Sequence, residues 1–158
     1  ADVGQQPEQC VPADLVYTFY FHGPAYQVVA SAWRDGDGSS ARMTDPLPDN
    51  HVPADAPLQV APRLVEFCFQ TAGLWEAGRD QRMALPQRVE SVSVLADPAG
   101  GEGGLRAHAV RRDDGAFDCV VVDDAGTVVV RLTGYHTVAL PGGLPEQVAD
   151  TLRSTFTD

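Results

Sequence analysis

Two polar side chains stand four residues apart inside a mostly apolar stretch of the sequence. Residues 61–78 read APRLVEFCFQTAGLWEAG, and Glu66 and Gln70 interrupt the apolar run near its middle. Because four residues make about one turn of an α-helix, both side chains would lie on one face and could reach the same small ligand. The first question is therefore what chemistry this pair could perform.

A carboxyl group in apolar surroundings is suited to proton donation. Burial disfavours the charged form of a carboxyl group, so an acid placed there can keep its proton near neutral pH and donate it. The sequence therefore predicts Glu66 as a general acid, with Gln70 either holding the same ligand hydroxyl or orienting the carboxyl. The alternative is a structural pair in which the two side chains satisfy each other on a buried helix.

Composition limits the fold and the partners. The 158 residues, 44% of them hydrophobic, suffice for one domain with a real core. The formal charge of −11, from 22 acidic and 11 basic residues, argues against nucleic acid or an anionic membrane as partner. The three cysteines lie at irregular spacing without a C-x-x-C pair, no long apolar run could span a bilayer, and the leading residues lack a signal pattern. We therefore expect a reduced, cytoplasmic protein.

The order of the expected elements favours an α+β fold. Residues 1–14 are expected to form a linker or loosely held leading segment, residues 15–140 the main domain and residues 141–158 a C-terminal helix or tail. Strand-like composition begins at LVYTFYF (15–21), a hairpin turns at Asp35-Gly36, and a loop with four prolines spans 45–60. A helix is expected from Pro62 to about Ala77, with Gly78 just past its end. Antiparallel strands follow at 88–96, 105–112, 116–124 and 127–140.

The helix is apolar all round, which predicts that it is buried on most of its surface. A single antiparallel sheet curling around the helix would bury it in this way. This arrangement is the hot-dog fold, and we expect the chain to form one half of a double hot dog.

Two segments then resemble the markers of a known family. YFHGPAYQVV (20–29) resembles the Y-G-P-x-F segment, and APRLVEFCFQTAG (61–73) the H-P-x-L-L-D-x-x-x-Q helix, of the second, C-terminal hot dog in polyketide synthase dehydratase domains. The sequences of both segments are most similar to those of the polyunsaturated fatty acid and enediyne synthase types. The resemblance covers about residues 15–140.

The resemblance implies a reaction and the residues that perform it. Such a domain removes water from a β-hydroxyacyl thioester carried on the phosphopantetheine arm of an acyl carrier protein, without a diffusible cofactor. The residue at the position of Glu66 protonates the leaving hydroxyl, and that of Gln70 helps to hold it. The segment with His22, Gly23, Pro24 and Tyr26 lines the substrate tunnel. The implied partners are the acyl carrier protein, a preceding hot dog and a second copy of the chain in a homodimer.

The sequence departs from the family pattern at three places. Glu66 stands where the family usually has Asp, Ala61 replaces the His that opens the helix motif, and His22 occupies the Tyr position before Gly-Pro. The family takes its base from a His in an H-x-x-x-G-x-x-x-x-P segment of the first hot dog, and that segment is absent from this sequence. A base would therefore come from another hot dog.

The remaining candidates have simpler interpretations. His108 and His136 lie in strand patterns and are expected to be sheet residues, whereas His51 lies in the proline-rich loop. The acid pairs at 113–114 and 123–124 flank glycine turns, where solvated aspartates are common, so no metal site is expected.

The sequence is also compatible with two other functions. A hot-dog acyl thioesterase would use Glu66 as a carboxylate that activates water, and would need no second hot dog. A non-catalytic hot dog that shapes the tunnel would need no histidine at all.

Overall fold

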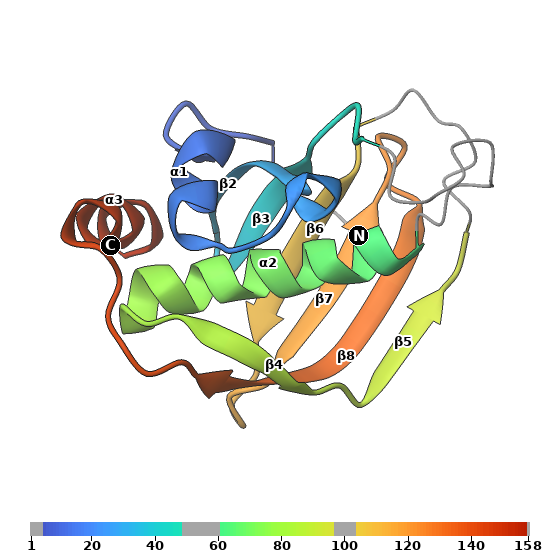
Figure 1. The fold of residues 1–158 in the computed structure, drawn as a ribbon. Coiled ribbons are helices and arrows are strands. Elements are labelled where there is room, and N and C mark those ends of the chain that lie inside the picture. Colours follow the sequence, from blue (N-terminus) through green and yellow to red (C-terminus); the bar gives the residue numbers. More distant parts are fainter. Residues whose placement is uncertain (1–4, 49–60, 97–103, 158) are drawn as a thin grey trace.

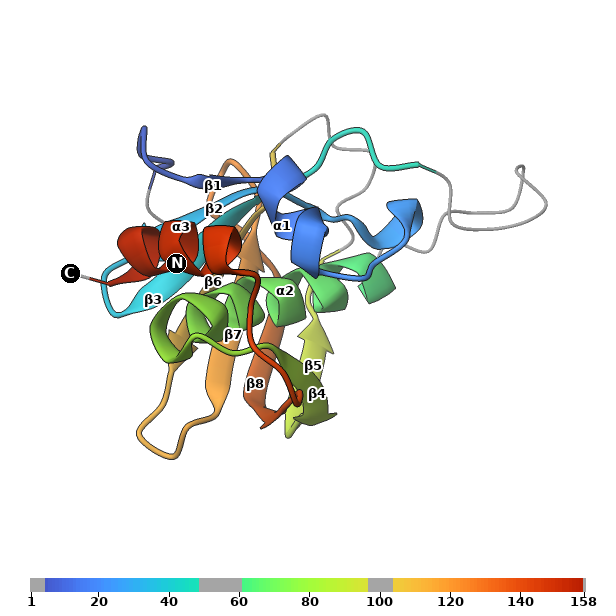
Figure 2. The ribbon, with the colours of Figure 1, turned by 60° about the vertical axis from the view of Figure 1, so that its left-hand side comes forward.

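The computed structural model describes residues 5–48, 61–96 and 104–157. Its strands form one antiparallel sheet that curls around a long central helix (Figures 1 and 2). The strands run in the order β1-β2-β3-β6-β7-β8-β4, with β5 paired to β8. The strands are β1 Val11–Pro12, β2 Val29–Asp35, β3 Gly38–Met43, β4 Ala84–Arg88, β5 Ser91–Val94, β6 Arg106–Arg111, β7 Phe117–Val122 and β8 Val128–Ala139. The hot-dog fold predicted from the sequence is confirmed.

The central helix α2 (Ala61–Asp80) lies against the concave side of this sheet. Leu64, Phe67 and Leu74 are fully buried, because the side chains of α2 face β2, β3, β6, β7 and β8. The helix ends about three residues later than expected, at Asp80: Gly78 is still helical, and the break comes at Gln81, whose φ of 55° lies in the left-handed region. Gly78 lies inside the helix at a point where Phe156 leaves no room for a Cβ.

The segment 15–21 was predicted as strand, and this prediction is wrong. Residues Ala13–Phe19 form the helix α1, followed by a 3₁₀ turn at Pro24–Tyr26. Asp14 stabilises the first turn of α1, where its carboxylate accepts a hydrogen bond from the backbone N–H of Leu15. The β-branched and aromatic residues of this segment have a strand-like composition, but their packing against the core decides the local structure.

A bend lets the long strand β8 pair with three neighbours. Its residues 130–133 pair with β5, its residues 136–139 pair with β4, and its other edge pairs with β7. Gly134 lies between the two pairings with a φ of +62°, and a Cβ there would meet the side chain of Glu90. Glycine at this position therefore allows the bend that brings β4 across α2.

The helix α3 (Glu146–Phe156) closes one end of the molecule by packing on the C-terminal half of α2. Phe156 is fully buried and lies edge-on to Trp75, with ring centroids 6.4 Å apart. No helix in the described ranges is long and apolar enough to cross a membrane.

We expect the substitution Gly78→Ala to destabilise the fold, although alanine is the better helix former by about 1 kcal/mol. A Cβ at residue 78 would lie 2.5 Å from Cβ of Phe156, so the two helices would have to separate. Overpacking of this kind costs about 1–3 kcal/mol, measurable by urea unfolding. The same substitution in a Phe156→Ala background should not destabilise further, and a stabilising Gly78→Ala in the native background would contradict this packing.

Candidate active site

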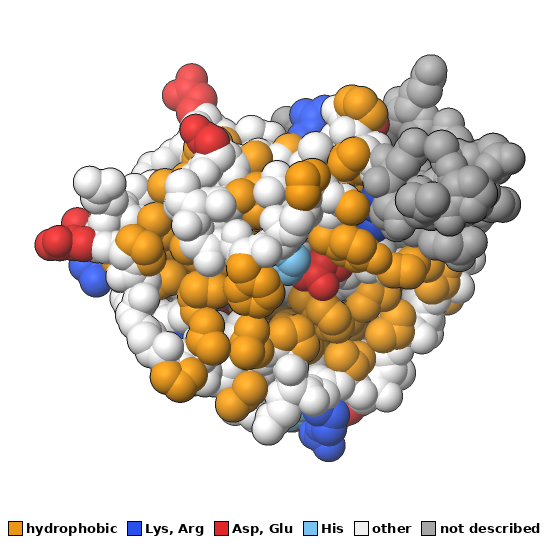
Figure 3. Space-filling model, viewed as in Figure 1, with side chains coloured by type: hydrophobic (Ala, Val, Ile, Leu, Met, Phe, Trp, Pro, Cys, Tyr) orange, Lys and Arg blue, Asp and Glu red, His pale blue; other side chains and the backbone are white. Residues whose placement is uncertain are grey.

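An apolar pocket opens beside α2, between the segment 20–22 and the edge strand β4. The cavity measures about 180 Å³ and is walled by α2, by residues 20–22 and by β4. In Figure 3 a histidine and an acidic side chain lie next to each other in the middle of a mostly hydrophobic face. Its lining includes Tyr20, His22, Glu66, Phe69, Gln70 and Tyr135.

One stripe of α2 faces this pocket. Glu66, Phe69 and Gly73 are partly exposed, whereas the residues on the other faces of the helix are mostly buried. Their spacing of three and four residues is that of one helical face. The helix is thus buried on most of its surface, as predicted, and its one open stripe carries the acid.

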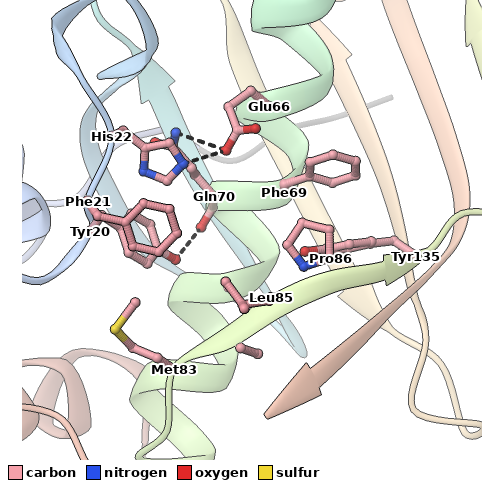
Figure 4. Close-up of a pocket in the computed structure, with 12 residues that line it drawn as sticks. Tyr20, Phe21, His22, Glu66, Phe69, Gln70, Met83, Leu85, Pro86 and Tyr135 are labelled. Atoms are coloured by element: carbon pink, nitrogen blue, oxygen red, sulfur yellow. Dashed lines mark hydrogen bonds and ion pairs between the residues drawn. The ribbon is translucent and has the colours of Figure 1, made fainter. Parts of the chain in front are cut away.

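The carboxyl group of Glu66 is held by one oxygen and open at the other. Its Oε1 lies 2.8 Å from Nε2 of His22 and accepts a hydrogen bond of 3.1 Å from Nε2 of Gln70 (Figure 4). Within the part of the chain that the structure describes, Oε2 of Glu66 makes no hydrogen bond. The side chain is 22% exposed, so the acid lies in the pocket wall and is not sealed in the core.

Gln70 is 2% exposed, and its amide group is fully used by the protein. Nε2 donates to Oε1 of Glu66 and, at 2.9 Å, to the backbone carbonyl of Tyr26. Oε1 accepts a hydrogen bond of 2.8 Å from the hydroxyl of Tyr17, which itself accepts one of 2.7 Å from the backbone N–H of Val29. Gln70 therefore has a fixed orientation before any ligand arrives.

His22 is fixed by its neighbours on both sides. Its ring stacks on Phe21 with centroids 5.3 Å apart and lies edge-on to Tyr20 at 5.5 Å. The side chain of Gln27 donates to its backbone carbonyl, and its Nδ1 is buried without a hydrogen-bond partner. With Nε2 engaged by Glu66 and Nδ1 shielded, neither ring nitrogen is open to a ligand in this arrangement.

Two neutral phenols complete the polar lining of the pocket. Burial raises the pKa of Tyr20 and that of Tyr135 well above the usual value for a phenol, and the nearby carboxylates raise them further. The Tyr20 hydroxyl donates to the backbone carbonyl of Gln70 at 3.1 Å and fits against Gly73, where a Cβ would come within 2.5 Å of it. Gly73 thus makes room for the Tyr20 ring.

The arrangement is suited to proton transfer. A carboxyl group whose one oxygen is fixed by two N–H groups presents the other oxygen to a ligand in a constant position. The surrounding apolar residues, among them Phe69 and Leu85, leave space for a mainly apolar ligand.

The other residues predicted for the site lie beside the pocket. Gly23, Pro24 and Tyr26 belong to the 3₁₀ turn and its cap, and none is among the described residues that line the cavity. Tyr26 contributes its backbone carbonyl to Gln70. The turn therefore supports His22 and Gln70 from behind.

The remaining histidines and acids take no part in this pocket. His108 contacts Ser40 at 2.9 Å on the sheet and His136 contacts Arg88, whereas His51 lies outside the described residues. Among the described residues, no group of three or more His, Cys, Asp or Glu side chains could hold a metal ion, and the three cysteines are free thiols.

Sequence reasoning did not identify Tyr17, Tyr20, Tyr135 or the β4 wall as parts of this site. The pairing of residues 50 or more positions apart, such as Tyr17 with Gln70, depends on how the sheet folds. The aromatic run 17–21 was the available signal, but its composition was interpreted as that of a strand.

The chain is similar to known proteins over most of its length. Residues 8–147 match the family described as "Polyketide synthase dehydratase N-terminal domain". The polyketide synthase ThaG of Burkholderia thailandensis is 31% identical over 137 residues, which are 80% of this chain and 2% of that protein. The second, C-terminal position predicted from the motifs is not confirmed by these matches and stays a prediction.

Solved structures of polyketide synthase dehydratases share the fold of this chain. A dehydratase from a study of substrate selection in the borrelidin and fluvirucin polyketide synthases is 25% identical with a TM-score of 0.64, covering 89% of this chain and 52% of that chain. The dehydratase of the CurF module of curacin polyketide synthase is 21% identical with a TM-score of 0.65, covering 84% and 49%. This chain therefore spans about half the length of these solved dehydratase domains.

Proposed function

Because this chain belongs to the polyketide synthase dehydratase family, we propose that it is the acid-bearing half of a dehydratase. Its substrate is a β-hydroxyacyl thioester on the phosphopantetheine arm of an acyl carrier protein. The observation that carries the proposal is the carboxyl of Glu66, with Oε1 held by two N–H groups and Oε2 open in an apolar pocket.

The proposed reaction uses acid and base chemistry only. A base removes a proton from the carbon next to the thioester carbonyl, and the electron pair forms the carbon–carbon double bond. The C–O bond at the β-carbon breaks, and Oε2 of Glu66 gives its proton to the departing hydroxyl, which leaves as water. The products are an enoyl thioester, water and ionised Glu66, which regains its proton as the base releases one.

The base is proposed to be a histidine of a second hot dog. Among the described residues that line the pocket, His22 is the only histidine, and its nitrogens are occupied or buried. The described chain therefore offers no free imidazole at the substrate position. Since the chain spans about half of the solved dehydratase domains, a second hot dog can supply the missing group.

A surface for that second hot dog lies around the pocket. Phe21 is 72% exposed, and further exposed apolar side chains lie on β5 and at the end of β8. Figure 3 shows a mostly hydrophobic face around the histidine and the acid, and an apolar face of this kind is typical of an interaction site. We propose that the chain is the C-terminal half, of the polyunsaturated fatty acid or enediyne type, because Glu66 and Gln70 lie on the central helix, as in the H-P-x-L-L-D-x-x-x-Q motif of the second, C-terminal hot dog in this family.

The acyl carrier protein is proposed as the substrate's carrier. A chain with a formal charge of −11 would repel an acidic carrier in free solution. Covalent linkage within one synthase would offset this repulsion by raising the effective concentration.

One observation also fits acyl thioester hydrolysis. Oε2 of Glu66 faces the pocket, and a carboxylate oxygen in that position could also activate a water molecule. Incubation with a β-hydroxyacyl thioester and, separately, with a plain acyl thioester distinguishes the two functions. With the histidine-bearing hot dog present, we expect enoyl product from the first and no free acid from the second; free acid without enoyl product would contradict the proposal.

We expect His22→Leu to lower turnover by roughly tenfold, because Oε1 of Glu66 loses one of its two donors and a single hydrogen bond is worth about 1 kcal/mol or more when the acceptor is ionised. His22→Gln can keep an N–H donor and should recover part of the loss. Steady-state kinetics of both variants checks this. Equal losses in the two variants would mean that the ring itself, not its donor, matters.

A further inference from the structure

A tyrosine outside the pocket reaches the acid through one intermediate residue. We infer that Tyr17, on α1, is a positioning residue that locks the Gln70 amide and thereby leaves Oε2 of Glu66 as the oxygen that carries the transferable proton. The inference rests on the proposed function for its catalytic consequence. The hydrogen bonds that connect Val29, Tyr17, Gln70 and Glu66 do not depend on the proposed function.

The direction of each hydrogen bond follows from the first one. The backbone N–H of Val29 can only donate, so the Tyr17 oxygen must accept at 2.7 Å. The single hydroxyl proton of Tyr17 then donates to Oε1 of Gln70 at 2.8 Å. Burial raises the pKa of Tyr17 well above the usual range, so the phenol keeps this proton in neutral solution.

This bond determines which end of the Gln70 amide faces the acid. With Oε1 turned toward Tyr17, Nε2 is turned toward Glu66 and the Tyr26 carbonyl, and its two hydrogens are both used. Gln70 has no donor left for a substrate hydroxyl. Of the two roles that the sequence left open for Gln70, the contacts favour orienting the carboxyl.

The donors around Oε1 of Glu66 determine which of its two oxygens carries the proton. Oε1 of Glu66 receives an N–H of Gln70 and lies 2.8 Å from Nε2 of His22. If Nε2 of His22 lacked its hydrogen, the neutral ring would carry it on Nδ1, which is buried without an acceptor. A buried N–H without a partner is costly, so the tautomer with the hydrogen on Nε2 is favoured. Oε1 then faces two donors, and a proton on Glu66 belongs on Oε2.

Loss of the Tyr17 hydroxyl removes the hydrogen bond that fixes the oxygen of the Gln70 amide. In Tyr17→Phe the oxygen of the Gln70 amide loses its donor, and the backbone N–H of Val29 loses its acceptor. The amide is then held only through Nε2, so it can tilt and weaken its hydrogen bond to Oε1 of Glu66. The variant should therefore lose turnover while substrate binding, which depends on the apolar lining, stays nearly the same.

The first readout is independent of activity. The side-chain amide NMR signals of Gln70, identified by their loss in Gln70→Leu, should exchange slowly with solvent and shift as Glu66 is titrated. In Tyr17→Phe, we expect faster exchange and loss of the coupling to the titration. The control is Thr18→Val, which removes the next hydroxyl on the same helix, an exposed group that bonds the carbonyl of Leu15; it should behave like the native chain.

The second readout is kinetic, with the histidine-bearing hot dog present. Tyr17→Phe should lower kcat by roughly tenfold, as for one lost hydrogen bond, and change KM little, whereas Thr18→Val should leave both constants unchanged. Native Gln70 signals in Tyr17→Phe would overturn the inference even in an active dehydratase. If the native protein does not dehydrate the thioester but the signals change as expected, the positioning by Tyr17 stands and the proposed function fails.

Discussion

Replacing Glu66 by glutamine should abolish most of the activity and leave the fold intact. Glutamine keeps the volume of the side chain and an oxygen that can accept from His22 and Gln70, but it has no proton to transfer. General acid catalysis contributes about 10²- to 10⁴-fold, so turnover of a β-hydroxyacyl thioester should fall by that order with the second hot dog present. The melting temperature should stay the same or rise, since the variant removes a partly buried ionisable group.

Glu66→Asp is the matched control for this prediction. It keeps an acid one methylene shorter, at the residue type that the family usually carries, and should retain more activity than Glu66→Gln. Melting temperature and turnover should be measured on the same samples. A structural polar pair would give the opposite pattern, with lost stability and activity falling only as folded protein is lost. Full activity in a folded Glu66→Gln variant would mean that the acid lies elsewhere.

The largest loss of stability is expected from Phe67→Ala. Phe67 is fully buried on the face of α2 that packs against the sheet, so its removal leaves a cavity in the centre of the hot dog. Substitutions of this kind cost about 3–5 kcal/mol, measurable by urea unfolding.

Phe21→Ala provides the comparison for this loss. It removes the same side chain from a position that is 72% exposed, so the isolated chain should lose about 0.5 kcal/mol or less. Equal losses at residues 21 and 67 would contradict the central position of α2 in the core.

The parts of the fold predicted from the sequence are those with strong local signals. The apolar composition of α2, the Asp35-Gly36 turn of the first hairpin and the glycine turns at 115 and 126 each correspond to an observed element. The segment 15–21 was predicted wrongly because its side chains suit a strand, whereas tertiary packing makes it a helix. Gly78 was interpreted as a helix end because space next to Phe156 cannot be seen in a sequence.

The candidate site was predictable only within one helix. The spacing of Glu66 and Gln70 placed them together, and their hydrogen bond of 3.1 Å agrees with that expectation. The contact of Glu66 with His22 and the bond of Tyr17 to Gln70 join segments more than 40 residues apart. Such contacts are set by strand order and register, for which single-residue patterns carry little information.

The position of the chain within its family remains a prediction. The motifs were interpreted as those of the second hot dog, whereas the matched family is described as the N-terminal domain. The acid on α2 and the absence of a free imidazole in the described pocket support the former. Both observations predict that activity needs a histidine from another hot dog.

The central claim is that Glu66 moves the proton of the β-hydroxyl group, and the reverse reaction tests it most directly. An enoyl thioester is incubated in water labelled with heavy oxygen, with the chain and its histidine-bearing partner, and the position of the label is determined by mass spectrometry. We predict label in the hydroxyl at the β-carbon with the native chain, some with Glu66→Asp and almost none with Glu66→Gln. Label in a released carboxylate would mean hydrolysis, and labelling of the hydroxyl by Glu66→Gln at the native rate would contradict the account.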